Sequence, residues 1–464
     1  MDTKKLRQKI LDLAIRGKLV PQDPNDEPAS VLLERIRAEK EQLIKEGKIK
    51  RSKKSAATDK SHYENVPFEI PESWVLSDFS ELVTLLSGRD LESNDCNSNR
   101  EGIPYLIGAS NIVDGKINIT RWTTKPLVIS KRGDILISCK GTIGEVVTNV
   151  IGEIHIARQF MAIQTLPMVY ADYIELYIKS IVNNIKRNAR GVIPGISRED
   201  ILHREIVLPP LEEQKRIVIE VEKWLDFIAE IEVGKAELES YIKQTKSKIL
   251  DLAISGKLVS QDPNDEPAIE LLKRINPAFK SCDNSHYENL PENWCLAKVK
   301  DVFAINPRNK AEDNTIAGFI PMTLIDDGYS NTFSYEKREW GSIKTGFTHF
   351  ADGDVAVAKI SPCLENRKSI VLRDLPNGIG AGTSELHVFR SSVVVPEYAL
   401  YFFKSEYFIS KCVGTFNGVV GQQRVGKNII EEIQIPIPPI NEQTKIVSTI
   451  ETIFTQLNTI TAEL

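Results

Sequence analysis

The stretch that comes nearest to a nucleotide-binding motif runs from Gly421 to Asn428. Gly421, Gly426 and Lys427 have the spacing of a phosphate-binding loop, in which main-chain amides cradle the phosphates. However, Asn428 stands where a serine or threonine should bind magnesium. The next predicted strand follows within a few residues, which leaves no room for the long helix that normally follows such a loop. The sequence therefore argues against nucleotide binding here.

Other catalytic chemistries also lack their residues. A DNA methyltransferase needs a glycine loop for S-adenosylmethionine and an Asn/Asp-Pro-Pro-Tyr/Phe tetrad, but the double prolines here follow Leu208 and Ile437. No set of paired carboxylates with a lysine indicates a nuclease, and nothing points to a Ser-His-Asp triad. The histidines show no metal-ligand spacing; they are His62, His155, His203, His286, His349 and His387. We therefore expect a non-catalytic binding protein, with no metal and no cofactor bound by this chain.

Basic and amide side chains gather in two corresponding regions of the chain. Such side chains on loops read the edges of bases, and lysine and arginine also anchor phosphates. The candidate DNA-binding residues of the first region are Lys140, Thr142, Arg158, Gln159, Arg190 and Arg198. Those of the second region are Lys359, Arg367, Lys368, Gln422, Gln423 and Arg424. For any single residue a solvated basic surface is at least as good an explanation, but the twofold arrangement favours double-stranded DNA.

A separate basic segment, from Arg35 to Lys54, allows two interpretations. It could be an arm that faces phosphates. A solvated helix end followed by a flexible linker through Ser52 to Ser55 is the favoured interpretation.

The elements that must position these residues are organised around one long helix, predicted from Leu211 to Ser255. Apolar residues recur along it in alternating steps of four and three, which is typical of helices that supercoil against a partner helix. At 1.5 Å per residue it would be about 67 Å long, which is too long for one core. The predicted seam of this helix comprises Ile217, Val221, Trp224, Ile228, Ile231, Leu238, Ile242, Ile249 and Leu252. A similar seam near the C-terminus comprises Ile446, Ile450, Ile453, Leu457 and Ile460.

The chain also repeats itself in a cyclic order. The paired segments are 9–15 with 248–254, 22–29 with 261–268, 71–74 with 291–294, and 209–214 with 438–443. In this alignment Leu464 corresponds to Lys235 and Met1 to Ser240, so the C-terminal helix followed by the N-terminal helix rebuilds the central one. Two half-repeats in cyclic order explain this pattern better than two tandem domains with unrelated helical tails.

We therefore predict an α+β protein. Two globular α/β domains are expected to be separated by a pair of long antiparallel coiled-coil helices, with a cyclic pseudo-twofold repeat. The second domain repeats the plan of the first, with a helix from Glu397 to Phe408 that matches one from Tyr173 to Ile185. The predicted regions are an N-terminal helical part with linker (1–60), a first globular domain (61–208), a central helical region (209–284), a second globular domain (285–437) and a C-terminal helix (438–464).

The composition is ordinary for a soluble protein, with a formal charge of −5. With 464 residues, the chain is long enough for two or three hydrophobic cores. No apolar run is long enough to span a membrane, and the start of the chain is not followed by a signal-peptide core. The cysteines lie far apart without a C-x-x-C pair, which indicates reduced packing residues. These features predict a cytoplasmic location.

The repeated motifs resemble those of the specificity subunits of type I restriction–modification enzymes. The residues that carry the resemblance are the repeats at 209–214 and 438–443, at 10–19 and 249–258, and at 71–74 and 291–294, together with Gly133–Ser138 and Gly141–Gly144. The resemblance covers nearly the whole chain. The second domain departs from the pattern at Lys359–Pro362, which stand where the first domain has its Gly-Thr-Ile-Gly loop, so base contacts carry over weakly there.

The resemblance implies a non-catalytic, sequence-specific DNA-binding subunit. Two target-recognition domains would each read one half of a split site, and two conserved helical regions would set the unread gap. Two modification subunits, which bind S-adenosylmethionine and methylate adenine, would dock on this chain, as would two restriction subunits that use ATP and magnesium. The alternatives are a coiled-coil scaffold that binds no DNA and a fused DNA adenine methyltransferase, against which the absent tetrad argues.

Overall fold

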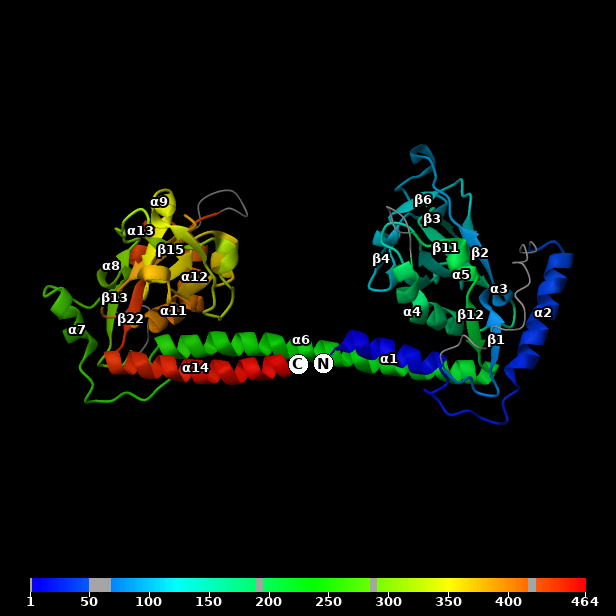
Figure 1. Ribbon diagram of the computed structural model, residues 1–464, viewed down its shortest axis with the longest axis horizontal. Coiled ribbons are helices and arrows are strands. Elements are labelled where there is room, and N and C mark those ends of the chain that lie inside the picture. Colours follow the sequence, from blue (N-terminus) through cyan, green and yellow to red (C-terminus); the bar gives the residue numbers. More distant parts are fainter. Residues whose placement is uncertain (1, 50–67, 189–194, 284–289, 416–422) are drawn as a thin grey trace. The chain divides into compact units, whose positions relative to one another are not determined.

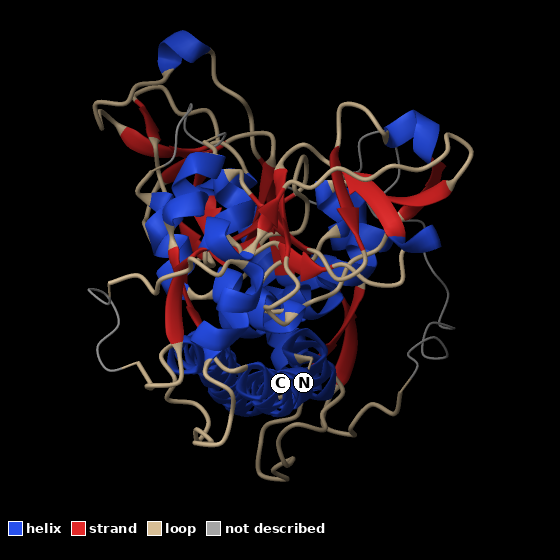
Figure 2. Cartoon of the chain, turned by 90° about the vertical axis from the view of Figure 1, so that its left-hand side faces the viewer, coloured by secondary structure: helices blue, strands red, loops and turns tan. Residues whose placement is uncertain are grey.

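The computed structural model describes residues 2–49, 68–188, 195–283, 290–415 and 423–464 (Figure 1). The chain divides into two compact units, Met1–Gly234 and Lys235–Leu464, called unit 1 and unit 2 below. Their boundary falls inside α6 (Leu211–Ile254), which therefore contributes to both units. The chain combines helices with short strands, as Figure 2 shows, and each unit contains both. This is the predicted mixed α and β composition with a long helix.

Unit 1 contains two four-stranded sheets. The first is antiparallel, in the order β2 (Val83–Ser87), β11 (Phe160–Thr165), β8 (Ile135–Ser138), β9 (Val146–Thr148). The second has the order β6 (Arg121–Thr123), β3 (Ile103–Leu106), β10 (Ile154–Ile156), β7 (Ile129–Ser130), with β3 and β10 parallel. A separate antiparallel pair, β1 (Val75–Asp78) and β12 (Glu205–Leu208), completes the unit with the short strands β4 (Ile112–Val113) and β5 (Lys116–Ile117).

The core of unit 1 lies on both faces of the first sheet. Ile135 and Ile137 of β8 pack into one hydrophobic cluster, which also includes Tyr173 of α4 (Ala171–Asn188). Leu136 belongs to a second cluster with Leu106 of β3. Successive side chains of a strand point to opposite faces, so a strand that is covered on both sides is apolar throughout. This explains the unbroken Ile-Leu-Ile run.

Unit 2 repeats the two four-stranded sheets and the separate antiparallel pair, without a counterpart of β4 and β5 among its described residues. Its sheets have the orders β14 (Ala304–Ile305), β21 (Leu386–Arg390), β18 (Val355–Ala358), β19 (Ser369–Val371), and β16 (Glu336–Glu339), β15 (Ile316–Ile320), β20 (Ile379–Gly382), β17 (Thr348–Ala351). The parallel pair is β15 with β20, and β13 (Cys295–Lys298) pairs with β22 (Gln434–Ile437). The internal repeat predicted from the sequence is confirmed at the level of strand order.

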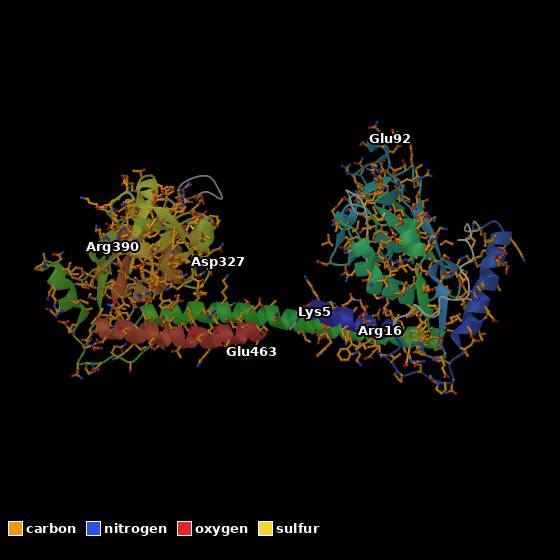
Figure 3. The ribbon with its side chains drawn as sticks, viewed as in Figure 1. Lys5, Arg16, Glu92, Asp327, Arg390 and Glu463 are labelled. Atoms are coloured by element: carbon orange, nitrogen blue, oxygen red, sulfur yellow. The ribbon has the colours of Figure 1, made fainter. Side chains whose placement is uncertain are left out.

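A polar contact at the same sheet position shows how the repeats diverge. In unit 1, Gln164 Nε2 donates to the Asp134 carboxylate at 3.2 and 3.1 Å. In unit 2 the corresponding residue is Arg390, which forms an ion pair with Asp354 through two contacts of 2.7 Å (Arg390 is labelled in Figure 3). The acidic partner is retained while its donor changes from an amide to a guanidinium.

The helix predicted from Glu397 to Phe408 is interrupted in the structure. Ser405 has extended φ and ψ angles of −68° and 153°, and it separates α11 (Pro396–Lys404) from α12 (Glu406–Val413). The Ser405 hydroxyl accepts a hydrogen bond from Phe408 N at 3.3 Å. A serine that caps a new helix in this way cannot also sit in the interior of a longer one.

Each unit pairs its half of α6 with a second, antiparallel helix. In unit 1 the partner is α1 (Thr3–Ile15), whose Arg7 forms an ion pair with Glu232 at 2.9 Å. In unit 2 the partner is α14 (Ile440–Glu463), and Lys235 Nζ donates to the carbonyl oxygen of Leu464 at 2.7 Å. The helices α2 (Ala29–Lys45) and α7 (Ala268–Ile275) follow the repeated loops.

The predicted seam residues divide into three groups by exposure. Buried members are Ile217, Val221, Ile228, Ile242, Ile249, Ile446 and Ile450. Partly buried members are Ile231, Leu252, Ile453 and Leu457. Three members are exposed, namely Trp224 (37%), Leu238 (37%) and Ile460 (43%).

The exposed members correct the strict heptad interpretation. Near its two ends α6 also buries Val218, Leu250, Ala253 and Ile254, which lie beside the seam. The buried stripe is therefore broad where the helix packs on a globular core. Farther from the ends, Trp224 and Leu238 at heptad positions stay 37% exposed, whereas Ile228 and Ile242 are buried.

The repeated motifs of unit 1 meet at one buried carboxyl group. Trp74 Nε1 donates to Glu213 Oε2 at 2.9 Å, and Gln22 Nε2 donates to Glu213 Oε1 at 2.9 Å. Glu213 is fully buried in the first turn of α6, where the helix dipole favours negative charge. Beside it, Arg216 forms an ion pair with Asp26 at 2.7 Å.

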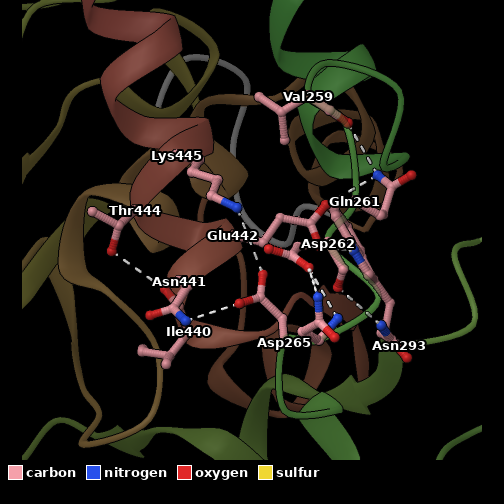
Figure 4. Close-up of polar contacts among 12 residues, drawn as sticks. Val259, Gln261, Asp262, Asp265, Asn293, Ile440, Asn441, Glu442, Thr444 and Lys445 are labelled. Carbon is pink, nitrogen blue, oxygen red and sulfur yellow. Dashed lines mark hydrogen bonds and ion pairs between the residues drawn. The ribbon is translucent and has the colours of Figure 1, made fainter.

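Unit 2 builds the same junction at the start of α14. Trp294 Nε1 and Gln261 Nε2 donate to the two oxygens of Glu442 at 2.9 and 3.0 Å. Asn441 Nδ2 donates to Asp265 Oδ1 at 2.8 Å, and Figure 4 shows these residues around Gln261 and Glu442. The junction fixes the globular part of each unit to the first turn of a long helix, which explains why three distant motifs repeat together.

Candidate nucleic-acid interface

Loops from several strands converge at one place in unit 1. Cys139, directly after β8, donates its N–H to the carbonyl oxygen of Gln159 at 2.7 Å and accepts from Ile196 N at 3.0 Å. Ala157 N donates to the carbonyl oxygen of Leu106 at 2.9 Å. These bonds join the loops that follow β3, β8 and β10 to the segment before α5 (Arg198–Leu202). We call this set of loops the loop frame.

The predicted DNA-binding residues of unit 1 lie on this frame. Lys140, Thr142 and Arg158 are exposed, and Gln159 is half-buried. Arg158 pairs with Asp90 at 2.7 Å, but 68% of its side chain stays exposed. Arg198 is tied to β2 through hydrogen bonds to Leu85 O at 2.9 Å and Ser87 Oγ at 3.0 Å. Arg190 lies outside the described residues.

The side chain of Gln159 lies over two glycines of the frame. A Cβ atom at Gly108 would lie 2.6 Å from Gln159 Oε1, and one at Gly141 would lie 3.7 Å from the same oxygen. Gly108 therefore leaves the space that the amide group occupies. The φ of Gly108 is −156°, which any residue can adopt. This position therefore favours glycine because glycine has no side chain, and not because of its backbone freedom.

Unit 2 builds the same frame from different residues. Lys359, directly after β18, donates its N–H to the carbonyl oxygen of Glu385 at 2.9 Å and accepts from Val425 N at 3.0 Å. Lys359 is thus the counterpart of Cys139, and Glu385 is the counterpart of Gln159. Sequence reasoning missed Glu385, because it looked for basic and amide residues and no repeated motif covers this turn.

An ion pair occupies this place in unit 2. Arg424 Nε and Nη2 donate to the two carboxylate oxygens of Glu385 at 2.8 and 3.0 Å. The hydrogen bond from Arg424 lowers the pKa of Glu385, and the same contact raises the pKa of Arg424. Gln423 is half-buried and its carbonyl oxygen accepts from Ser361 N at 2.7 Å; Gln422 lies outside the described residues.

Two predicted DNA-binding residues of unit 2 prove to hold the fold together. Arg367 donates from Nε to Lys404 O at 3.0 Å and pairs with Glu406 at 2.6 Å, and only 11% of its side chain is exposed. Lys368 Nζ donates to the carbonyl oxygens of Met322 and Ile325 at 3.3 and 2.8 Å. These contacts already satisfy both cations, so we remove them from the candidate interface.

A buried histidine supports the frame of unit 2 from beneath. His387 Nε2 lies 3.2 Å from the carbonyl oxygen of Val425, and Nδ1 lies 3.3 Å from Asn306 Nδ2. Burial lowers the pKa of His387 to about 4. The neutral ring with its proton on Nε2 satisfies both partners, since it donates to Val425 and accepts from Asn306.

Metal and membrane sites are not found within the described ranges. No cluster of three or more His, Cys, Asp or Glu residues there could hold a metal ion. No helix of that part is both long enough and apolar enough to cross a membrane.

Comparisons with known proteins agree with this arrangement. The family model described as "Type I restriction modification DNA specificity domain" matches residues 71–240 and 291–464. The EcoEI type I specificity subunit of Escherichia coli is 40% identical over 235 residues, which are 47% of this chain and 39% of that protein. The chain thus aligns with about two-fifths of that relative's length. The EcoDI specificity subunit of Escherichia coli is 21% identical over 84% of each chain.

Solved structures share the fold. The HsdS subunit from Thermoanaerobacter tengcongensis aligns with a TM-score of 0.51 and 16% identity, over 86% of this chain and 93% of that one. A chain from a structural study of assembly and conformational transition of the type I R-M system aligns with a TM-score of 0.59 and 17% identity, over 86% and 94%.

Proposed function

Because the chain belongs to the family of type I restriction–modification DNA specificity proteins, we propose that it is the sequence-specific DNA-binding subunit of such a complex. Each unit binds one half of a bipartite site through its loop frame. The observation that supports this most directly is that both units build the same frame but fill it with different polar side chains, Gln159 in one and Glu385 with Arg424 in the other. Two half-sites of different sequence require the same backbone framework with different side chains that contact the bases.

The chemistry then belongs to partner subunits. We propose that this chain docks two modification subunits, which supply S-adenosylmethionine binding and adenine methylation, and two restriction subunits, which use ATP and magnesium. The chain itself is non-catalytic in this proposal. The absence of methyltransferase motifs from its sequence supports this division.

The test is to co-express the chain with its modification subunit and to map every methylated adenine in the host genome. We expect one bipartite sequence, with two fixed halves and an unread gap. The purified complex should also bind that duplex more tightly than a scrambled one at physiological salt. Unmethylated DNA together with equal binding to both duplexes would refute the proposal and favour the scaffold alternative. Crosslinking of S-adenosylmethionine to the isolated chain would instead favour a fused methyltransferase.

A further inference from the structure

The turn that leads into β11 in unit 1 and into β21 in unit 2 forms matching main-chain hydrogen bonds in the two loop frames. In each unit one residue of this turn gives its carbonyl oxygen to the N–H of the residue that follows the central strand, at 2.7 Å for Gln159 and 2.9 Å for Glu385. That second residue then accepts an N–H from the segment before a short helix, at 3.0 Å in both units. The main chain therefore holds the Cα atoms of Gln159 and Glu385 in equivalent positions.

In unit 1 the matched position holds the side-chain amide group of Gln159. The Gln159 side chain has no hydrogen-bond partner among the residues that the structure describes, although it is seated over Gly108 and Gly141. Exposed Lys140 and Arg158 flank it. An amide group donates and accepts side by side, which matches N6 and N7 of adenine in the major groove, while flanking cations match phosphates.

In unit 2 the matched position holds a carboxylate that orients an arginine. Glu385 is the more covered member of the pair, with 25% of its side chain exposed, against 44% for Arg424. The guanidinium is thus held in a fixed plane at the surface by two hydrogen bonds. A rigid guanidinium is the commonest reader of guanine, through O6 and N7.

We propose that the matched position sets one base of each half-site. Gln159 reads an adenine in the half bound by unit 1, and Arg424, oriented by Glu385 at that position, reads a guanine in the half bound by unit 2. Glu385 is a positioning residue, which orients Arg424 without contacting the base. Gly108 is a positioning residue for Gln159. The inference rests on the proposed function and adds to it the identity of two specificity-determining side chains.

The experiment compares methylated sequences from the wild-type complex and from variants, each assembled with the modification subunit. Gln159→Ala should relax one adenine in one half-site, with discrimination at that base falling roughly five- to 150-fold, and should leave the other half unchanged. Gly108→Ala should relax the same base, because the added methyl group displaces the amide while the backbone remains unstrained.

Arg424→Gln should relax one guanine in the opposite half-site by a similar factor. Glu385→Gln should give a weaker relaxation of the same base, since the arginine remains but loses its fixed plane. The matched control is Arg373→Gln, which breaks another Arg–Glu ion pair of unit 2, that with Glu397, and should leave the methylated sequence unchanged.

The outcomes separate this inference from the function on which it rests. If the wild-type complex yields no bipartite sequence, the proposed function fails. If it yields one and the Gln159 and Arg424 variants methylate the same sequence with unchanged discrimination, the assignment of these readers is overturned. The same holds if Gln159→Ala alters both halves. Circular dichroism and assembly with the modification subunit show whether each variant has folded.

Discussion

Replacing His387 by methionine should remove an acid-sensitive element from unit 2. His387 pairs with Val357 in the sheet, and the residue in the same register of unit 1 is Met161, which pairs with Ile137. The substitution therefore installs the side chain that the chain itself uses at the equivalent position. In the wild type the His387 ring holds Val425, the neighbour of Arg424.

The size of the pH-dependent change in stability follows from the pKa of the buried His387 ring. Burial lowers the pKa from 6.5 to about 4, so between these values the unfolded chain takes up a proton that the folded chain refuses. The stability due to the neutral ring is complete above pH 6.5 and is lost as the pH falls towards 4. A shift of this size corresponds to about 3 kcal/mol across that window. In the charged ring, Nδ1–H would face the Asn306 Nδ2 amide group, so that two donors would meet. The Asn306 side chain cannot turn to avoid this without loss, because its Oδ1 accepts a hydrogen bond from Val388 N at 2.9 Å.

The assay is urea unfolding of the full chain at several values between pH 7 and pH 4, with hydrogen exchange of peptides from unit 2 as the local measure. At pH 7 His387→Met should be less stable by about 1–3 kcal/mol, because Val425 O and Asn306 Nδ2 lose their partner. As the pH falls, this difference should shrink and then vanish or reverse. Histidines and carboxylates elsewhere titrate in both proteins and cancel in the comparison, and peptides from unit 1 provide an internal control. Parallel pH profiles for the two proteins would refute the reasoning.

Three further predictions concern the junctions, the DNA contacts and the long helix. Trp294→Phe and Glu442→Gln should each destabilise unit 2 by about 1–3 kcal/mol, and the double variant should cost less than the sum in urea unfolding; additive costs would show that the 2.9 Å hydrogen bond does not couple them. Arg158→Ala should weaken binding of the complex to all duplexes and reduce the slope of log affinity against log salt by about one, whereas an unchanged slope would remove Arg158 from the phosphate contacts. Inserting four residues after Gly234 lengthens α6 by about 6 Å. At about 3.4 Å per base pair, the gap in the methylated sequence should grow by on the order of one or two base pairs, with both half-sites retained. An active variant with an unchanged gap would show that α6 does not set the spacing.

The sequence alone determined the repeat and the elements that carry it. Segments 22–29 and 261–268 are identical, and the glutamine of each donates to the buried carboxylate of its junction, Glu213 or Glu442. The period of the apolar residues identified α6 and α14, since the repeat of a helix is written directly into the spacing of its buried side chains. Local rules of this kind need no knowledge of distant contacts.

Only the tertiary structure decided which polar residues are available to bind. Arg367 and Arg424 look alike in the sequence, yet main-chain carbonyl and carboxylate oxygens enclose the first, while the second lies at the surface beside Glu385. The correspondence of Gln159 with Glu385 was equally hidden, because it is fixed by main-chain hydrogen bonds between loops that share no sequence. Exposure and register depend on contacts between residues far apart in the chain, and side-chain identity does not encode these contacts locally.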